Sequence, residues 1–179
     1  MSVFSNPAGR AASAARAYVA AIVELVGDRD PIELLAVFPA RLAAATSNLS
    51  DEALRRPERE GKWSIIEVTK HLADTEMVFS FRIRMALAQQ KPRITGFDQD
   101  QWAQRLGYRS ADLHSTLELH AVLRKANVDL LRSLPPAALE RVGLHEERGE
   151  ESVALMVKLA AGHDLVHLRQ IERIGAGRT

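Results

Sequence analysis

Apolar residues along this chain recur every three or four positions, which is the spacing of one face of an α-helix. The pattern predicts helices over residues 9–27, 31–48, 64–90, 111–134 and 152–174. The third of these has a clear start, because Ser64 and Glu67 form an S-x-x-E capping box just ahead of an apolar run. No stretch alternates apolar and polar residues as a half-buried strand does, so the sequence predicts an all-α protein.

The segments between the predicted helices differ in length and character. The stretch S-D-E-A-L-R-R predicts one short turn of helix, and residues 91–110 predict a long connection with a short helix near Trp102. Residues 146–151, E-E-R-G-E-E, predict a solvated loop whose glutamates favour the start of the next helix. Four long helices with such connections indicate a four-helix bundle over residues 31–176, preceded by an N-terminal extension, residues 1–30, that we expect to be helical.

The composition is that of a folded protein without a strong electrostatic preference. Of the 179 residues, 46% are hydrophobic, which is enough for a single domain with a core. The 24 basic and 23 acidic residues leave a formal net charge of +1, so we expect neither nucleic acid nor a membrane as a partner. Cysteine is absent, and no segment reaches the roughly 20 apolar residues that span a bilayer, so a cytoplasmic location is expected.

Three histidines carry the most chemical information. His163 and His167 stand four apart and therefore share one face of a helix, where two imidazoles can bind one metal ion. His71, on a facing helix, would complete a three-nitrogen site with an open coordination position, as in catalytic metal centres. The alternative is a partly exposed helix that happens to carry two histidines. If the helices of His71 and His167 run antiparallel, the bundle order is up-down-down-up, with a long crossover between its second and third helices.

Three further residues are candidates for a role beside the metal. Asp164 occupies the second position of H-D-L-V-H, where metalloproteases place a glutamate as general base, but it can equally be a surface carboxylate or one that supports a ligand. Gln170 shares the face of His163 and His167, so it orients a ligand, binds substrate or is a satisfied interior amide. His120 lies on the inner stripe of its helix, either reaching the cavity or hydrogen-bonded in the core.

Other polar and aromatic residues are expected to have structural roles. We expect Asp74 and Glu76 to be surface groups or to support a ligand, and His114 and His145 to lie at the surface.

Three aromatic residues flank these segments. Trp63, just before the capping box, is expected to form a hydrophobic staple. Trp102 and Tyr108, in the long connection, are expected either to roof the site or to anchor the loop.

Three stretches together resemble the DinB-like family, also called the DinB/YfiT-like metalloenzymes. They are G-K-W-S-I-I-E-V-T-K-H-L-A-D-T-E, a D-x-x-x-W connection from Asp98 to Trp102, and G-H-D-L-V-H-L-R-Q-I. The resemblance covers roughly residues 32–174 and leaves the N-terminal extension outside it.

The resemblance implies an up-down-down-up bundle, often a homodimer, that binds a divalent metal through three histidines. Carried over to this sequence, the ligands are His71, His163 and His167. We expect zinc or nickel as the metal, and a homodimer.

Related families with this fold include thiol-dependent S-transferases and a mycothiol-dependent isomerase. A cysteine-free protein with such a site can activate an external low-molecular-weight thiol, whose thiolate attacks an electrophile in the same cavity. We therefore expect a metal-dependent thiol transferase. The alternatives are a metal-dependent hydrolase and a non-catalytic bundle in which the metal is structural.

Overall fold

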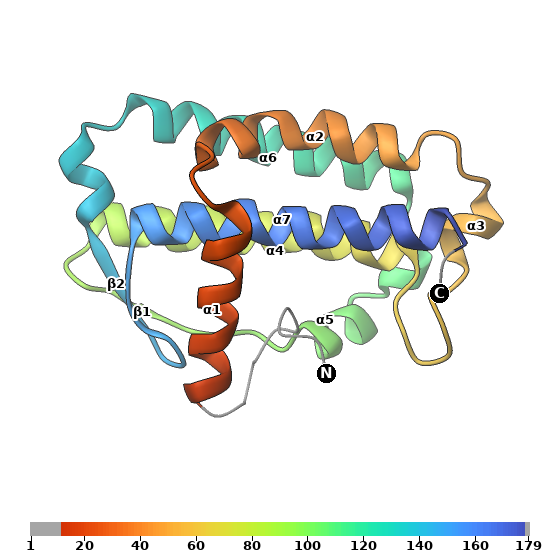
Figure 1. Cartoon of the computed structure of the whole chain (residues 1–179), viewed down its shortest axis with the longest axis horizontal. Coiled ribbons are helices and arrows are strands. Elements are labelled where there is room, and N and C mark those ends of the chain that lie inside the picture. The colour runs from red at the N-terminus through yellow and green to blue at the C-terminus, as the bar shows by residue number, and fades with distance from the viewer. Residues whose placement is uncertain (1–11, 178–179) are drawn as a thin grey trace.

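Four long helices form the bundle in the structure, a computed structural model that describes residues 12–177. They are α2 (Pro31–Thr46), α4 (Ile65–Ala88), α6 (Leu113–Ser133) and α7 (Val153–Gly175). Helices α2 and α7 run in one direction and α4 and α6 in the other, which confirms the predicted up-down-down-up order (Figure 1). Each helix packs on two neighbours, with α2 beside α7 and α6, and α4 beside α6 and α7.

Local capping explains where the bundle helices begin. The Asp30 carboxylate accepts hydrogen bonds from the first free backbone N–H groups of α2. The capping box of Ser64 and Glu67 opens α4 as predicted, with both reciprocal hydrogen bonds present. Ser152 caps α7 through the N–H of Leu155. Every predicted end of these four helices lies within two residues of the observed end.

The crossover between α4 and α6 returns along the length of the bundle (Figure 1). It contains the short strand β1 (Arg93–Ile94), the helix α5 (Gln99–Arg105) and the 3-10 turn η1 (Tyr108–Ser110). Helix α5 is the short helix that the sequence predicts near Trp102. Because the crossover spans the bundle, α6 can start at the same end as α4 and run parallel to it.

The prediction of a solvated loop over residues 146–151, and of no strands, is wrong. Strands β2 (Val142–His145) and β3 (Gly149–Ser152) form an antiparallel hairpin, and β1 pairs with β2 in parallel. Strands of two to four residues are too short to give an alternating pattern in the sequence. The glutamates of this segment therefore belong to the hairpin, and the first turn of α7 contains no acidic residue.

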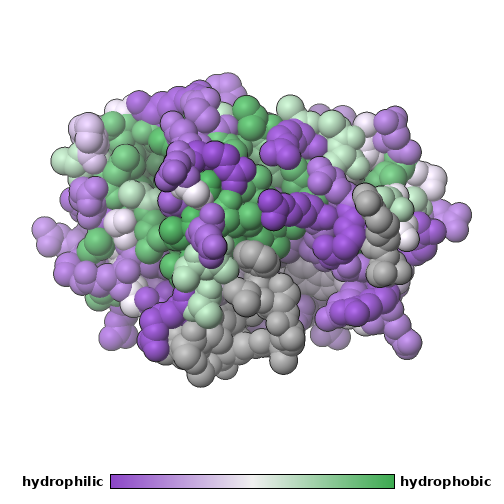
Figure 2. Space-filling model, viewed as in Figure 1, coloured by the Kyte–Doolittle hydropathy of each residue, from purple (hydrophilic) through white to green (hydrophobic). Residues whose placement is uncertain are grey.

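The N-terminal helix α1 (Ala12–Val26) crosses the bundle and packs on α7 (Figure 1). Its contact depends on Gly162, because a Cβ there would lie only 2.5 Å from Ile22 Cγ2. The predicted helix start at residue 9 lies outside the described residues. Figure 2 shows hydrophobic side chains along the middle of this face, over α7 and the adjoining part of α1.

Two short helical segments complete the fold. The predicted short turn is α3 (Asp51–Arg55), and the 3-10 helix η2 (Pro136–Glu140) follows α6. Among the described residues, none of the helices combines the length and apolar character required to cross a bilayer.

Candidate metal centre

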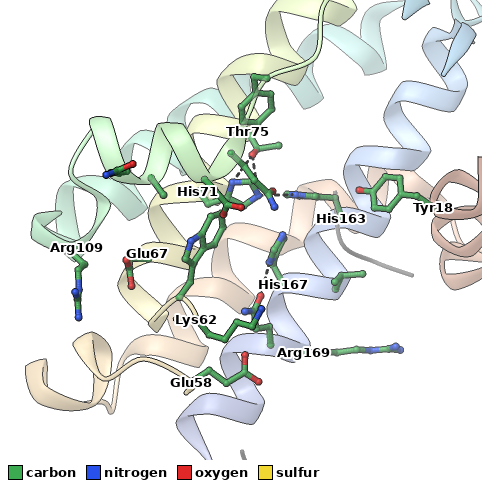
Figure 3. A pocket seen from close by; sticks show the side chains of 18 of the residues that line it. Tyr18, Glu58, Lys62, Glu67, His71, Thr75, Arg109, His163, His167 and Arg169 are labelled. Carbon is green, nitrogen blue, oxygen red and sulfur yellow. Dashed lines mark hydrogen bonds between the residues drawn. The ribbon is translucent and has the colours of Figure 1, made fainter. Parts of the chain in front are cut away.

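The bundle brings His71 of α4 together with His163 and His167 of α7 (Figure 3). The Nε2 atoms of His71 and His163 are 3.1 Å apart, and one ring nitrogen from each of the three residues lies within 4.8 Å of the others. Two nitrogens that share one tetrahedral ion at about 2.0–2.1 Å are themselves roughly 3.3 Å apart. The donor set therefore fits a single metal ion.

Gln170 fixes the orientation of His167. The His167 Nδ1–H donates to Gln170 Oε1 at 2.9 Å, so the Nε2 lone pair is left to face the other two histidines. A ring held in this way presents one nitrogen in a fixed tautomer, as metal-binding histidines usually do. This contact is the one expected of a residue that orients a ligand, and Gln170 also lines the cavity; its role stays a prediction.

Burial keeps the three imidazoles neutral. It lowers the pKa of His167 to about 4, against a smaller opposing effect of the hydrogen bond to Gln170. Burial also lowers the pKa of His71 and of His163 well below the usual value, and the neighbouring histidines lower both further. Three neutral rings at pH 7 offer lone pairs to a metal ion without first releasing protons.

Aromatic packing supports the His71 side of the site. Trp63 packs against the apolar cluster that contains Val68, the expected staple contact, and its ring centroid lies 5.0 Å from that of His71. Tyr108 is fully buried with its ring 6.3 Å from Trp63, so it anchors the crossover. Trp102 packs on Phe97 at 4.7 Å and is likewise an anchor.

The histidines open onto a cavity of about 1210 Å³ between α4, α7, the crossover and α1. The Tyr18 side chain, from α1, points toward His163 (Figure 3). Burial raises the pKa of Tyr18 to about 12, so its hydroxyl, which is protonated at neutral pH in any tyrosine, stays a hydrogen-bond donor in alkaline solution as well. Sequence reasoning missed Tyr18 because nothing in the α1 pattern shows that this helix reaches the site.

The cavity wall carries more basic than acidic side chains. Its acidic residues are Glu58, Glu67 and Asp100. Its basic residues are Arg59, Lys62, Arg82, Arg109, Arg148, Arg169 and Arg173. The excess of positive charge in a concave site favours anionic ligands, although the chain as a whole is almost neutral.

A buried ion network lies behind the histidines, and it excludes the surface position that was one alternative for Asp164 and for Glu76. Arg124 donates to Asp164 Oδ2 at 2.5 Å and to Glu76 Oε2 at 2.7 Å, and Asn127 donates to Glu76 Oε1 at 2.6 Å. All four side chains are buried, so neither Asp164 nor Glu76 is a surface group. Asp164 lies one position beyond His163 and therefore points toward α6, away from the cavity, so it is not placed as a general base.

The ion pairs decide the charge of this network. Burial raises the pKa of Asp164 to about 6, against the opposing effect of Arg124. Burial also acts to raise the pKa of Glu76, but Arg124 and Asn127 together outweigh it and the pKa is lowered. Both carboxylates are therefore predominantly ionised at neutral pH and satisfied by Arg124.

The remaining candidates lie away from the metal site. His120 is buried in the core with its ring 5.5 Å from that of Phe38, and burial lowers its pKa to about 4. Of the two expectations for His120, the core histidine is the observed one, since it does not line the cavity. Asp74 was expected at the surface or beside a ligand, but it is buried and accepts a hydrogen bond from Lys70 Nζ at 2.5 Å.

The two outer histidines differ from each other. His114 is exposed, as expected, and its Nε2 lies 3.3 Å from Glu118. The expectation of a surface position for His145 is wrong: the residue is 3% exposed, and the Glu147 N–H donates to its Nδ1 at 3.2 Å. His145 is buried because β2, the strand that the sequence pattern did not reveal, turns it inward.

The fold and the site define a four-helix bundle with a three-histidine centre able to bind a metal ion. A family model described as the DinB superfamily matches residues 34–171. The chain belongs to the DinB superfamily, as its sequence motifs indicated.

Relatives and a solved structure agree with this assignment. A protein of Geobacillus thermodenitrificans (strain NG80-2), named "Putative metal-dependent hydrolase", is 31% identical over 170 residues, which cover 94% of this chain and 88% of the relative. A second with that name, OB0782 of Oceanobacillus iheyensis, is 32% identical over 133 residues, 74% of this chain and 77% of the relative. The structure of YfiT from Bacillus subtilis, described as a probable metal-dependent hydrolase with an unusual four-helix bundle topology, matches with a TM-score of 0.78 at 26% identity, covering 82% of this chain and 85% of that one.

Proposed function

We propose that this chain is a metal-dependent hydrolase whose reaction takes place where the three histidines meet the cavity. The observation that carries the proposal is the convergence of three neutral imidazoles at the wall of a cavity large enough for a small molecule. The names of the relatives support hydrolysis over thiol transfer, which was the first expectation from the sequence.

The residues of the proposed site have three different roles: binding the metal, orienting a ligand and binding the substrate. A divalent ion on three neutral ligands keeps its full charge, lowers the pKa of a bound water or thiol and leaves one position open to substrate. His71, His163 and His167 would hold the ion, and zinc or nickel suits such nitrogen donors. Gln170 keeps the His167 ring in place. The protonated Tyr18 hydroxyl can donate a hydrogen bond to a substrate oxygen in the cavity.

Metal titration and a hydrolysis assay test this proposal together. Metal-free protein should bind one zinc or nickel ion per chain in a calorimetric titration. The loaded protein should hydrolyse at least one member of a panel of activated esters and amides, and chelator should abolish that activity. His114→Ala, which removes an exposed histidine, is the control and should behave like wild type. Hydrolysis that survives chelation would contradict the proposal.

A thiol transferase is the second candidate, and one observation favours it. Two of the three cavity carboxylates have other partners: Glu67 closes the capping box, and Glu58 accepts a hydrogen bond from Arg173 at 2.8 Å. Asp100 lies in the crossover helix α5. Beyond these three, no carboxylate in the described part of the chain lines the cavity, where a general base would have to reach the attacking water. A thiol needs less help of this kind than water, because it loses its proton more readily.

Adding a thiol separates the two candidates. Metal-loaded protein is incubated with an alkylating electrophile, with and without a low-molecular-weight thiol, and the products are identified by mass spectrometry. Conjugate that forms only with thiol and metal supports the transferase. Ester or amide cleavage without thiol supports the hydrolase. If neither occurs and chelator unfolds the protein, the metal is structural and the non-catalytic alternative holds.

We also propose a homodimer. The α4 residues Met77 and Phe81 and the α6 residues Leu119 and Val122 are exposed hydrophobic side chains, with Phe81 65% and Val122 68% accessible. Since α4 and α6 pack side by side, their outer faces can form one surface that a second copy covers. Light scattering at micromolar concentration should give twice the chain mass, and Phe81→Ser with Val122→Ser should give a monomer. A monomeric wild type would overturn the homodimer proposal. The cytoplasmic location is a separate prediction from the sequence.

A further inference from the structure

Arg82 is a buried cation on the cavity wall without a carboxylate partner. It is 8% exposed, and its Nη2 donates to the Thr95 carbonyl at 2.5 Å, while its guanidinium lies 5.9 Å from the centre of the Phe97 ring. No carboxylate in the described part of the chain is within ion-pair distance of it. Arg124, the other deeply buried arginine, has two such partners. The two residues therefore show how differently this fold treats a buried positive charge.

Three glutamates near Arg82, namely Glu146, Glu147 and Glu151, offset part of its positive charge, but none of them lines the cavity. Burial lowers its pKa to about 10 and Arg148 lowers it further, against a smaller opposing effect of the nearby glutamates. Two of them have other hydrogen bonds, since Glu151 accepts from Arg148 and Glu146 accepts the Gly96 N–H at 2.6 Å. On its cavity side the guanidinium therefore has no anion, and an anionic ligand bound there would recover part of the free energy that its burial costs.

The free donors of Arg82 are open to the cavity. A guanidinium has five N–H groups, and the only hydrogen bond of Arg82 within the described residues uses one of them. Within that part of the chain, each nitrogen of Arg82 either has a hydrogen-bond partner or is accessible to solvent. Nε of Arg124, by contrast, is buried and has no partner. Because Arg82 lines the same cavity as the histidines, its remaining N–H groups can reach a ligand there.

Arg82 lies at the far end of a stripe that begins at the metal site. His71, Thr75, Phe79 and Arg82 all line the cavity from one face of α4. The eleven positions from His71 to Arg82 correspond to about 16 Å along the helix axis. Between them the wall is formed by Thr75 and Phe79, with Leu159 from α7. A ligand that touches both ends must therefore be elongated, with an apolar middle.

We propose that the cavity takes an elongated substrate with an oxyanion group, a carboxylate or a phosphate, at the end remote from its reacting group, and that Arg82 binds this oxyanion. The position of the reacting group, at the three histidines, rests on the proposed function. The anion site at Arg82 does not depend on it. A guanidinium suits both anions because it donates two parallel hydrogen bonds to either.

Ligand-observed NMR titrations of the metal-free full chain, in chelator, test the anion site apart from the metal. The probes share one pentyl chain and differ in their polar end: hexanoate, pentyl phosphate and neutral hexanamide. Wild type should bind at least one anion about tenfold more tightly than hexanamide, the effect of one charge-assisted hydrogen bond. The tighter of the two anions identifies the preferred group.

Two variants show whether Arg82 is responsible. Arg82→Gln should reduce the preference for the anion to within about twofold. Arg84→Gln removes the same charge from the same helix, but Arg84 is bonded to Ser80 and Asn127 outside the cavity, so the preference should persist. Equal loss in both variants, or no preference in wild type, would overturn the proposal.

Two further variants cover a failure of Arg82→Gln to fold and separate the anion site from the metal site. If circular dichroism shows that Arg82→Gln does not fold, Arg82→Lys is used, and it should weaken anion binding about threefold while leaving hexanamide unchanged. Unchanged anion binding in that variant overturns the proposal. His167→Ala should lose metal and keep the anion preference, so a failure of the metal proposal is distinguishable from a failure of this one.

Discussion

Two polar clusters sit back to back in the bundle and differ in what they leave unsatisfied. In the Arg124 network, both carboxylates and the guanidinium bind one another across α4, α6 and α7. In the histidine cluster, neutral nitrogens face each other and a cavity. The adjacent positions 163 and 164 on α7 belong to the two different clusters. A charged group that is buried with its ion-pair partners contributes to the fold, whereas a nitrogen that keeps a free lone pair beside a cavity is available for binding.

Breaking the closed cluster should have the largest effect. Arg124→Met leaves the carboxylates of Glu76 and Asp164 buried and unpaired, so the free energy of unfolding should fall by about 3–5 kcal/mol. Urea denaturation followed by circular dichroism measures this. The further changes Glu76→Gln and Asp164→Asn remove the stranded charges and should recover part of the loss. A loss below about 1 kcal/mol for Arg124→Met would mean that the network adds little to stability.

Lowering the pH should weaken the fold through the buried histidines. The folded pKa of His120 is about 4, below its usual value of 6.5, so the unfolded chain takes up the proton first. Stability is therefore fully present above about pH 6.5 and falls as pH drops toward 4, by on the order of 3 kcal/mol for His120. Urea denaturation of metal-free protein across this range measures the slope. His120→Leu should make the slope shallower without abolishing it, because His71, His163 and His167 keep their lowered pKa values, and exposed His114→Leu should leave the slope unchanged.

Removing one imidazole from the open cluster should affect metal binding more than folding. For His167→Ala we expect metal affinity to fall at least about 100-fold, because removing a ligand should cost more than removing a residue that only supports a ligand. Wild type should melt higher in added metal, because a ligand that binds only the folded state stabilises it. The variant should lack this shift and should melt much like wild type in chelator. Unfolding of wild type by chelator alone would show that the metal is structural.

The smallest effect should come from the residue that orients a ligand. Gln170→Ala removes the partner of His167 Nδ1 and should weaken metal binding by about 10- to 100-fold. Competition with a chromophoric chelator measures the change. Gln170→Glu keeps an acceptor at that position and should retain more affinity than the alanine variant. Equal affinity in all three proteins would mean that the hydrogen bond does not position the ring.

The bundle and its histidines were predictable because they depend on local spacing. Apolar periodicity and the capping box of Ser64 located the helices, and the four-residue step from His163 to His167 placed two rings on one face. Antiparallel packing then brought His71 alongside. Each of these inferences uses only the geometry of a single helix or of one helix pair.

The features that the sequence did not reveal depend on contacts between distant segments. The hairpin that buries His145 is too short to leave a periodic pattern. Arg124 looks like any helical arginine until α4 and α7 bring carboxylates to it from 48 and 40 residues away. Tyr18 reaches the cavity only because α1 folds across α7.

The glycine before the first histidine of the α7 pair gives the cavity one of its sides. Gly162 lets α1 approach so closely that a single added methyl group would collide with Ile22. Helix α1 lies outside the residues matched by the family model, yet it brings Tyr18 to the cavity. Helix α1 therefore forms one wall of the cavity, although it precedes the four-helix bundle in the sequence. A chain that lacked α1 would keep the three histidines of α4 and α7 but would lose the Tyr18 side of the cavity, and with it the limit on the size and shape of the ligand.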